Sequence, residues 1–259
     1  MQNELNIASL QVDIIWENPQ ANIEKYSAMI DSISDDVDLV ILPEMFATGF
    51  SMNPASCAET VEGFSISWMQ EIAKEKQVAI MGTLAIKENN NFYNRLVFVH
   101  PNGETETNNK RHLFSYGGED KVYTQGEDRI IINYKGWKIN PMICYDLRFP
   151  VWTRNTNDYD VLIFMANWPK PRINAWDTLL KARAIENMCY TIGVNRVGID
   201  GNNLEYIGHS QTIDMLGNVV SDSVENKEMI FETTLNKKEL DKVRNKFRFL
   251  EDRDFFEVL

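Results

Sequence analysis

The feature that most constrains this fold is an apolar, strand-like run from Trp137 to Ile143 that stops abruptly at Cys144. Polar, aromatic and basic residues follow it, and then comes Pro150. A buried run of this kind hides its backbone inside a sheet, and the sharp exit leaves one side chain in a cleft. Cys144 is therefore either a nucleophile presented at a strand end or a thiol packed like a small hydrophobic residue.

The remainder of the chain alternates short apolar runs with helical patterns. The predicted strands cover residues 5–12, 37–42, 78–86, 91–100, 104–109, 130–134, 137–143, 161–165, 191–195, 205–215, 219–223 and 229–234. The predicted helices cover residues 19–33, 65–76, 151–155, 176–188 and 237–245. Because hairpins interrupt the alternation, we expect mixed sheets. Many buried strands with few helices predict one α/β domain over residues 1–259, with two packed sheets and helices outside.

Composition narrows the possible functions. The chain has 259 residues, of which 44% are hydrophobic and 25% charged, as in ordinary globular proteins. Its formal net charge of −12 argues against a nucleic acid partner, because phosphate binding needs a basic face. The first residues show no signal-peptide pattern, and no stretch approaches the ~20 apolar residues that span a bilayer. We therefore expect a cytoplasmic protein without a membrane partner.

The three cysteines, Cys57, Cys144 and Cys189, are odd in number and show no CxxC spacing. Neither a disulfide framework nor a zinc site is expected from this pattern, and a reducing cytoplasm fits it best. We predict no metal and no cofactor. The pattern leaves the roles of Cys57 and Cys189 open.

Charged residues at two other strand ends could converge on Cys144. Glu44 follows Pro43 directly after the predicted strand 37–42, and Lys110 follows the alternating strand 104–109. Taken alone, a residue such as Glu44 is more often a surface or capping carboxylate. Lys110, next to Arg111, is by itself more often part of a solvated face.

Together, a cysteine, a glutamate and a lysine in one dry pocket suit acyl transfer. The thiolate is the nucleophile, and a nearby carboxylate can take the thiol proton as general base. A lysine, with the backbone N–H after the cysteine, can stabilise the developing oxyanion. Attack on a carbonyl would give a thioester, which water then hydrolyses. No histidine fits the role of the base; His112 lies two residues past Lys110 and is easily mistaken for one.

Three segments carry a family resemblance. LPEMF (residues 42–46), KRHLF (110–114) and CYDLRFP (144–150) resemble, in this order, the three signatures of the nitrilase (carbon–nitrogen hydrolase) superfamily. The resemblance implies Glu44 as general base, Lys110 as oxyanion stabiliser and Cys144 as nucleophile. It also implies a four-layer α-β-β-α sandwich that pairs with a second subunit. The second glutamate frequent in this family is similar to Glu119, although Glu127 lies in the same loop.

Further stretches are similar to the bacterial omega-amidases, namely TGFSM (48–52), residues 144–160, ANWP (166–169) and ARAIEN (182–187). This likeness implies hydrolysis of the terminal amide of 2-oxoglutaramate or 2-oxosuccinamate to the 2-oxo diacid and ammonia. Another amide, a nitrile or an N-carbamoyl compound is the alternative substrate for the same fold and triad. A non-catalytic thiol redox or binding protein is the alternative from another class.

The substrate of an omega-amidase carries a carboxylate far from its amide, so an acidic protein needs a local cationic patch to bind it. Arg172 is the candidate, because Pro169 and Pro171 restrict its loop. Trp168 and Phe46 are expected to form apolar walls, and Tyr145 is expected at the same site.

Arg148 is instead expected to point inward and hold Asp146 or a neighbouring loop. We also expect a homodimer that buries apolar residues of the helices after Cys144, namely Val151, Trp152, Trp176, Leu179 and Met188.

Overall fold

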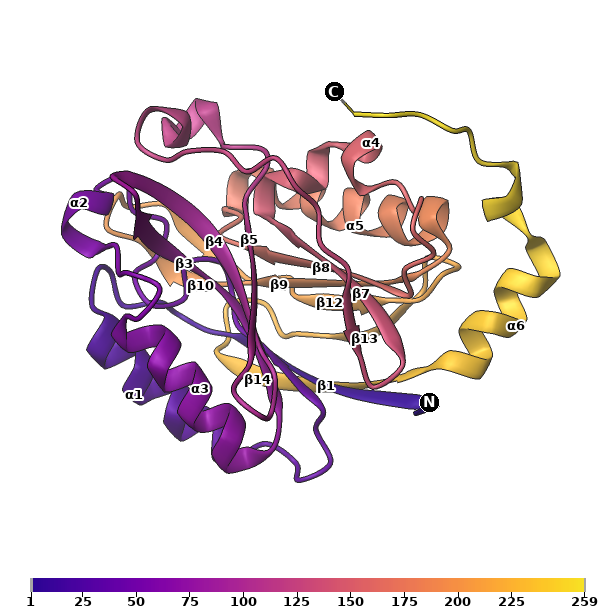
Figure 1. Ribbon diagram of the computed structural model, residues 1–259, viewed down its shortest axis with the longest axis horizontal. Coiled ribbons are helices and arrows are strands. Elements are labelled where there is room, and N and C mark those ends of the chain that lie inside the picture. Colours follow the sequence, from indigo (N-terminus) through magenta and orange to yellow (C-terminus); the bar gives the residue numbers. More distant parts are fainter. Residues whose placement is uncertain (1, 259) are drawn as a thin grey trace.

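Two six-stranded sheets pack face to face in the computed structural model, which describes residues 2–258 (Figure 1). The first sheet has the order β14-β1-β2-β3-β4-β5 and contains β1 (Glu4–Gln11), β2 (Leu39–Ile41), β3 (Ala79–Glu88), β4 (Asn91–Val99), β5 (Thr105–Asn109) and β14 (Met229–Asn236). The second sheet has the order β13-β12-β9-β8-β7-β6 and contains β6 (Ile132–Tyr134), β7 (Trp137–Ile143), β8 (Val161–Ala166), β9 (Tyr190–Asn195), β12 (Gln211–Ile213) and β13 (Val219–Asp222).

Both sheets are mixed, as the sequence predicts. In the first sheet the parallel strands β1, β2 and β3 are flanked by antiparallel neighbours, and β7, β8 and β9 have the same arrangement in the second sheet. Parallel strands end at the same edge of a sheet. Ligand sites of α/β proteins form at such carboxyl-terminal edges, so these two edges are where a site is expected.

Helices cover the outer face of each sheet and complete four layers. Helices α1 (Pro19–Ile30) and α3 (Phe64–Lys76) pack on the first sheet, while α4 (Pro150–Thr153) and α5 (Ile173–Asn187) pack on the second. The strand β8 shows why the runs are continuously apolar: Ile163 faces the core between the sheets and Phe164 faces α5. Both of its faces are buried. The predicted α-β-β-α sandwich is therefore confirmed.

One predicted strand is wrong. Residues 205–215 do not form a single strand, because Gly208 and His209 both adopt positive φ angles, of 84° and 61°. The chain breaks there into β11 (Glu205–Ile207), which pairs with β10 (Val197–Ile199), and β12, which joins the second sheet. The break frees the β10–β11 hairpin from both large sheets.

The remaining elements are short helices and turns that connect or follow the strands. A short helix, α2 (Pro54–Cys57), interrupts the segment 47–62. Residues 2–258 also form 3-10 turns at Ser115–Gly117 (η1), Glu119–Lys121 (η2), Cys144–Arg148 (η3), Lys170–Arg172 (η4) and Phe249–Asp252 (η5). Helix α6 (Lys237–Phe247) follows β14, and its N-cap Asn236 accepts a hydrogen bond from the Glu239 backbone N–H. None of the helices between residues 2 and 258 has the length and apolar character needed to cross a membrane.

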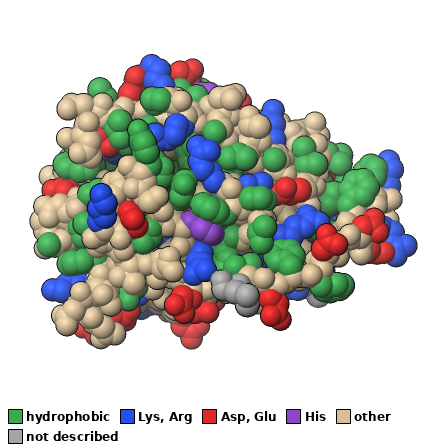
Figure 2. Space-filling view, turned by 90° about the horizontal axis from the view of Figure 1, so that it is seen from above, with side chains coloured by type: hydrophobic (Ala, Val, Ile, Leu, Met, Phe, Trp, Pro, Cys, Tyr) green, Lys and Arg blue, Asp and Glu red, His purple; other side chains and the backbone are tan. Residues whose placement is uncertain are grey.

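The surface carries charges of both signs. On the face seen from above, Lys and Arg side chains are interspersed with Asp and Glu side chains and with apolar ones (Figure 2). The face shown offers no broad basic surface of the kind that binds a polyanion.

Candidate active site

The predicted catalytic residues come together where the strands of both sheets end. Glu44 follows β2 and Lys110 follows β5 in the first sheet, whereas Cys144 follows β7 in the second. Glu119 reaches the same place from the η2 turn. Packing the two sheets face to face is therefore what brings a carboxylate and a lysine from one sheet to a thiol from the other.

Cys144 occupies a tight turn. Its φ angle is 41°, in the left-handed region that non-glycine residues seldom adopt. Asp146 holds this turn, since its Oδ2 accepts from the Ile143 backbone N–H at 3.0 Å and its Oδ1 accepts from the His112 N–H at 3.1 Å. Such backbone strain is typical of residues presented for chemistry at a strand end. His112 supports the turn: its ring lies 3.6 Å from the Phe149 ring, stacked on it.

Lys110 and two carboxylates form a buried ion cluster, which we call the acid–base cluster (Glu44, Lys110 and Glu119). The Lys110 Nζ lies 2.9 Å from Glu44 Oε1 and 2.9 Å from Glu119 Oε2. All three side chains are fully shielded from solvent. The Lys110 Nζ also lies 5.1 Å from the centre of the Phe50 ring, which closes the cluster toward the pocket.

Two asparagines that the sequence analysis did not single out complete the cluster. Asn94 Nδ2 donates to Glu44 Oε1 at 2.8 Å and to Glu119 Oε1 at 3.1 Å, while its own Oδ1 accepts from Thr83. The Asn167 backbone N–H donates to Glu44 Oε2 at 2.9 Å. The Glu44 carboxylate is thus fixed on both oxygens. Asn167 follows β8 directly, and a polar residue at a strand end is a sequence signal for a site residue. Asn94 lies in the middle of β4, where the sequence gives no such signal.

The electrostatics favour a neutral thiol beside a charged lysine. Burial raises the pKa of the Cys144 thiol well above its ordinary value, Glu44 raises it further, and Lys110 opposes the change. Burial alone would lower the pKa of Lys110, but the carboxylates of Glu119 and Glu44 outweigh it and raise this pKa above its ordinary value. Burial likewise raises the pKa of Glu119 against the opposing effect of Lys110. A nucleophilic Cys144 therefore needs a base to remove its proton during attack.

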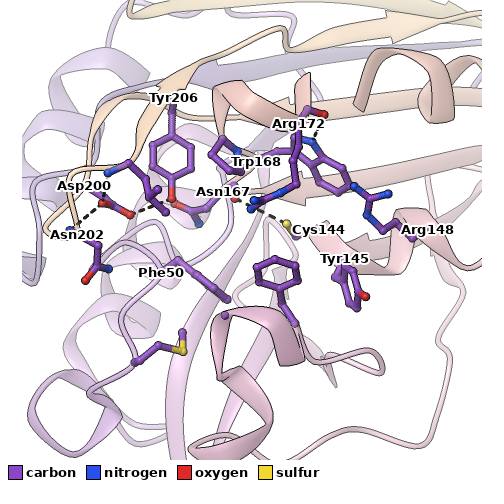
Figure 3. Close-up of a pocket in the computed structure, with 15 residues that line it drawn as sticks. Phe50, Cys144, Tyr145, Arg148, Asn167, Trp168, Arg172, Asp200, Asn202 and Tyr206 are labelled. Atoms are coloured by element: carbon purple, nitrogen blue, oxygen red, sulfur yellow. Dashed lines mark hydrogen bonds between the residues drawn. The ribbon is translucent and has the colours of Figure 1, made fainter. Parts of the chain in front are cut away.

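Cys144 opens into a pocket of about 250 Å3 among the loops that follow the strands of both sheets, beside the β10–β11 hairpin (Figure 3). The lining residues include Trp168, Tyr145 and Arg172, where the sequence placed them. The Trp168 Nε1–H donates to the Arg172 carbonyl at 2.8 Å. The Tyr145 ring lies edge-on to the Phe114 ring, with 5.1 Å between ring centres.

The prediction for Phe46 is wrong. Its side chain is fully buried in the outer core, where its ring centre lies 5.6 Å from that of Tyr26 and 5.9 Å from that of Trp68. The cause is local: Met45 has a φ angle of 46°, which turns the next side chain back beneath the sheet. Phe50, four residues further on, lines the pocket instead.

The prediction for Arg148 is also wrong. Asp146 is satisfied by backbone N–H groups and His112, so it does not need Arg148 as a partner. Arg148 lines the pocket, with its guanidinium carbon 4.9 Å from the centre of the Trp168 ring.

The other cysteines lie elsewhere. Cys189 is buried beside Thr191, and burial raises the pKa of its thiol to about 12. Cys57 ends α2 and faces the Asn53 carbonyl. All three cysteines are free, and no cluster of residues suited to hold a metal ion occurs within the described part of the chain.

A family model described as carbon-nitrogen hydrolase matches residues 6–245, and the chain belongs to this family. It is 37% identical over 254 residues to the omega-amidase YafV of Escherichia coli (strain K12), with 98% of each chain covered. It is 35% identical over 221 residues to the 2-oxoglutaramate amidase of Bacillus subtilis (strain 168), covering 83% of this chain and 85% of that protein.

A solved structure is similar over the whole length. XC1258 from Xanthomonas campestris, a CN-hydrolase superfamily protein with an arsenic adduct in its active site, superposes with a TM-score of 0.97 and is 39% identical, with all of both chains covered. The agreement extends the family assignment from the motifs to the complete fold.

The acid–base cluster makes a stability prediction. Lys110→Met leaves two buried carboxylates without a cation, so the free energy of unfolding should fall by roughly 3–5 kcal/mol, measured by urea denaturation. Adding Glu119→Gln removes one of the two charges and should restore part of the loss. Lower pH, which protonates one carboxylate, should also narrow the gap to wild type. If Lys110→Met is as stable as wild type at every pH, the three groups do not form a compensated ion cluster.

Proposed function

We propose that this protein hydrolyses the terminal amide of short 2-oxo acid amides, 2-oxoglutaramate and 2-oxosuccinamate, to the 2-oxo diacid and ammonia. The observation that carries the proposal is a partly exposed cysteine on a strained turn, beside a buried and fixed glutamate–lysine pair, in a pocket that also holds arginines. The names of relatives that are 35–38% identical support the same substrate class.

Acylation begins with the neutral Cys144 thiol. As its sulfur attacks the amide carbonyl, Glu44 takes the thiol proton, and the carbonyl oxygen gains negative charge. Lys110 and the backbone N–H of Tyr145 stabilise this oxyanion. Glu44 then returns the proton to the amide nitrogen, the C–N bond breaks and ammonia leaves, which yields a thioester on Cys144.

Deacylation uses the same groups in reverse order. Glu44 removes a proton from a water molecule that attacks the thioester carbonyl, and the C–S bond breaks as the thiol regains its proton. Glu119 does not touch the reacting atoms in this scheme. It holds Lys110 in place, and it ties the cluster to the loop over the pocket, since its Oε2 accepts from the Phe114 backbone N–H at 2.6 Å.

The substrate chain would extend from Cys144 along the pocket. Trp168 and Tyr145 supply flat apolar walls for a short carbon chain, and Arg172 supplies a fork of N–H donors for the distal carboxylate. Phe50 takes the place that the sequence analysis gave to Phe46.

The same fold and cluster would also serve another amide, a nitrile or an N-carbamoyl compound. Ammonia release from a panel of these substrates separates the possibilities. A thiol redox role for Cys144 is disfavoured by its high thiol pKa, because oxidant sensing depends on the thiolate. The free state of the three cysteines agrees with a reducing cytoplasm, which we propose as the location.

Wild-type protein should release ammonia from 2-oxoglutaramate, and Cys144→Ala should reduce the rate to background, because no other group in the pocket replaces the nucleophile. Cys189→Ala is the matched control, since this thiol is buried outside the pocket. A Cys144→Ala protein that keeps near wild-type turnover would refute a cysteine mechanism.

The thioester intermediate can be trapped. Glu44→Gln keeps the shape of the side chain but removes the base that both steps use. Because the Glu44 charge raises the pKa of the Cys144 thiol, its loss makes the thiol proton easier to lose and partly compensates acylation, whereas the attacking water gains nothing. Deacylation should therefore slow more than acylation, and an acyl adduct should accumulate. Mass spectrometry of the substrate-soaked variant should then show the mass of the acyl group on the peptide that contains Cys144. An adduct on Cys57 or Cys189 instead would contradict the assignment of the nucleophile.

We also propose a homodimer, although three of the five apolar residues expected at its interface are not available to a partner. Trp152, Trp176 and Met188 are 7%, 0% and 2% exposed, so they are buried within one subunit rather than left for a partner. Val151 on α4 and Ile185 on α5 remain 55% and 50% exposed and are the apolar surface that a partner would cover.

Sedimentation at micromolar concentration should give about twice 30.0 kDa. Ile185→Asp should shift the distribution toward the single chain, because it places a charge in the covered surface. A wild-type protein that sediments as a single chain would rule out the dimer.

A further inference from the structure

Two guanidinium groups line one pocket of a protein with a large excess of acid. The chain has 38 acidic and 26 basic residues apart from histidine, yet Arg148 and Arg172 both face the pocket that contains Cys144 (Figure 3). Among residues 2–258, neither of these side chains forms an ion pair or donates a hydrogen bond to another residue. Unpaired cations at a pocket of an acidic protein indicate an anionic ligand.

Aromatic rings hold both guanidinium groups. The Arg148 group lies over the Trp168 ring at 4.9 Å, and the Arg172 group lies over the Phe114 ring at 5.0 Å. The hydrogen bond from Trp168 to the Arg172 carbonyl links the two supports. Stacking on a ring uses the flat face of a guanidinium and leaves the N–H groups at its edge free for a carboxylate.

The one acidic residue of the pocket lining is already engaged. Asp200 Oδ1 accepts from the backbone N–H groups of Asn202 and Leu204 at 2.8 and 3.0 Å, and its Oδ2 accepts from the Tyr206 hydroxyl at 2.9 Å. Figure 3 shows Asp200 beyond Tyr206, on the side of Cys144 away from Arg148. The part of the pocket near the two arginines is therefore cationic.

We infer that Arg148 is a second specificity-determining residue, which with Arg172 selects omega-amides that lack an α-ammonium group. Arg172 and a bound carboxylate together have no net charge. Arg148 leaves one positive charge in excess. An amino-acid amide carries its ammonium on the same carbon as its carboxylate, so it must bring that ammonium against the excess charge. A 2-oxo or unsubstituted acid amide has no such group.

This inference rests on the proposed amidase function and names what the site excludes. The accepted class is the monoamides of dicarboxylic acids with an oxo group or hydrogen at the α-carbon. The rejected class is the free amino-acid amides asparagine and glutamine. Without such discrimination, the same acyl chemistry would act on both classes.

The test compares kcat/KM for succinamate, asparagine and propionamide, which have respectively a carboxylate alone, a carboxylate with an ammonium, and neither. Wild type should prefer succinamate to asparagine. Arg148→Met should lower kcat/KM for succinamate by roughly 10–100-fold, as loss of one charged hydrogen bond does. It should lower the succinamate-to-asparagine ratio by at least about tenfold and leave propionamide within about twofold. Arg148→Lys, which keeps the charge, should retain most of the ratio.

Lys170→Met is the matched control. Lys170 lies in the same turn as Arg172 but pairs with Glu205 at 2.9 Å outside the pocket, so its loss removes one positive charge without changing the site. The succinamate-to-asparagine ratio of kcat/KM in Lys170→Met should equal that of wild type. Ratios do not depend on the fraction of folded enzyme, so a partly destabilised variant still gives an answer. If asparagine is hydrolysed too slowly to measure, its inhibition constant is measured instead, with succinamate as the substrate.

Three results would overturn the inference. An equal loss on all three substrates in Arg148→Met would make Arg148 a packing residue for Trp168. An unchanged ratio would place the selection elsewhere, and a wild type that treats asparagine and succinamate alike would show that no selection exists. In each case the amidase function stands. Only the absence of ammonia release from every omega-amide would remove both.

Discussion

The arrangement of this site depends on one buried cation. Lys110 stands between two carboxylates with no solvent to screen it, and each partner lies 2.9 Å away. A buried charge is tolerated only when it is paired and hydrogen-bonded, so the three side chains can be buried together but not singly. The Asn94 amide donates to Glu44 Oε1 and Glu119 Oε1, and the Asn167 N–H donates to Glu44 Oε2. The Phe114 N–H donates to Glu119 Oε2, so every carboxylate oxygen of the cluster accepts a hydrogen bond. The cluster thus fixes the edge of the first sheet and the loop over the pocket at once.

The second constraint is that the site is divided between the two sheets. Glu44 belongs to the edge of one sheet, and Cys144 belongs to the edge of the other. Asn167, at the end of β8, joins them, because its backbone N–H and its Nδ2 donate to Glu44 at the carboxylate and at the carbonyl. Its own carbonyl oxygen lies 4.0 Å from the Cys144 sulfur. The large core between the sheets therefore affects catalysis indirectly, because it sets the distance between the strand ends that carry Glu44 and Cys144.

The sequence predicted the sandwich and the positions of Glu44, Lys110, Glu119 and Cys144 because strand ends and family motifs are local signals. It failed where a side chain's direction depends on a turn or on a distant partner. Phe46 was misplaced because the left-handed turn at Met45 cannot be read from neighbouring residues. Arg148 was misplaced for a different reason.

Arg148 lies in the η3 turn, and its direction depends on which groups satisfy Asp146. Those groups include His112, which is 34 residues away in the chain. Asn94 could not be identified from the sequence because its role also depends on distant partners, Glu44 and Glu119. A polar residue within a strand does not by itself indicate a functional site. Tertiary contacts decided the cases of Arg148 and Asn94, and the sheet pairing that creates those contacts lies beyond local patterns.

The charge balance of the site explains how Glu44 can deprotonate Cys144, although burial makes this thiol hold its proton tightly. With a neutral thiol, the cluster contains one cation and two anions, a net charge of −1. When Glu44 takes the proton, its own charge disappears and the sulfur gains one, so the net charge is still −1. Proton transfer therefore moves charge over a short distance within a site of low dielectric instead of creating it there, and Lys110 remains beside both its old and its new location. What the buried site must stabilise during attack is only the additional charge separation on the substrate oxygen, and a lysine kept charged by its two glutamates is placed to do that.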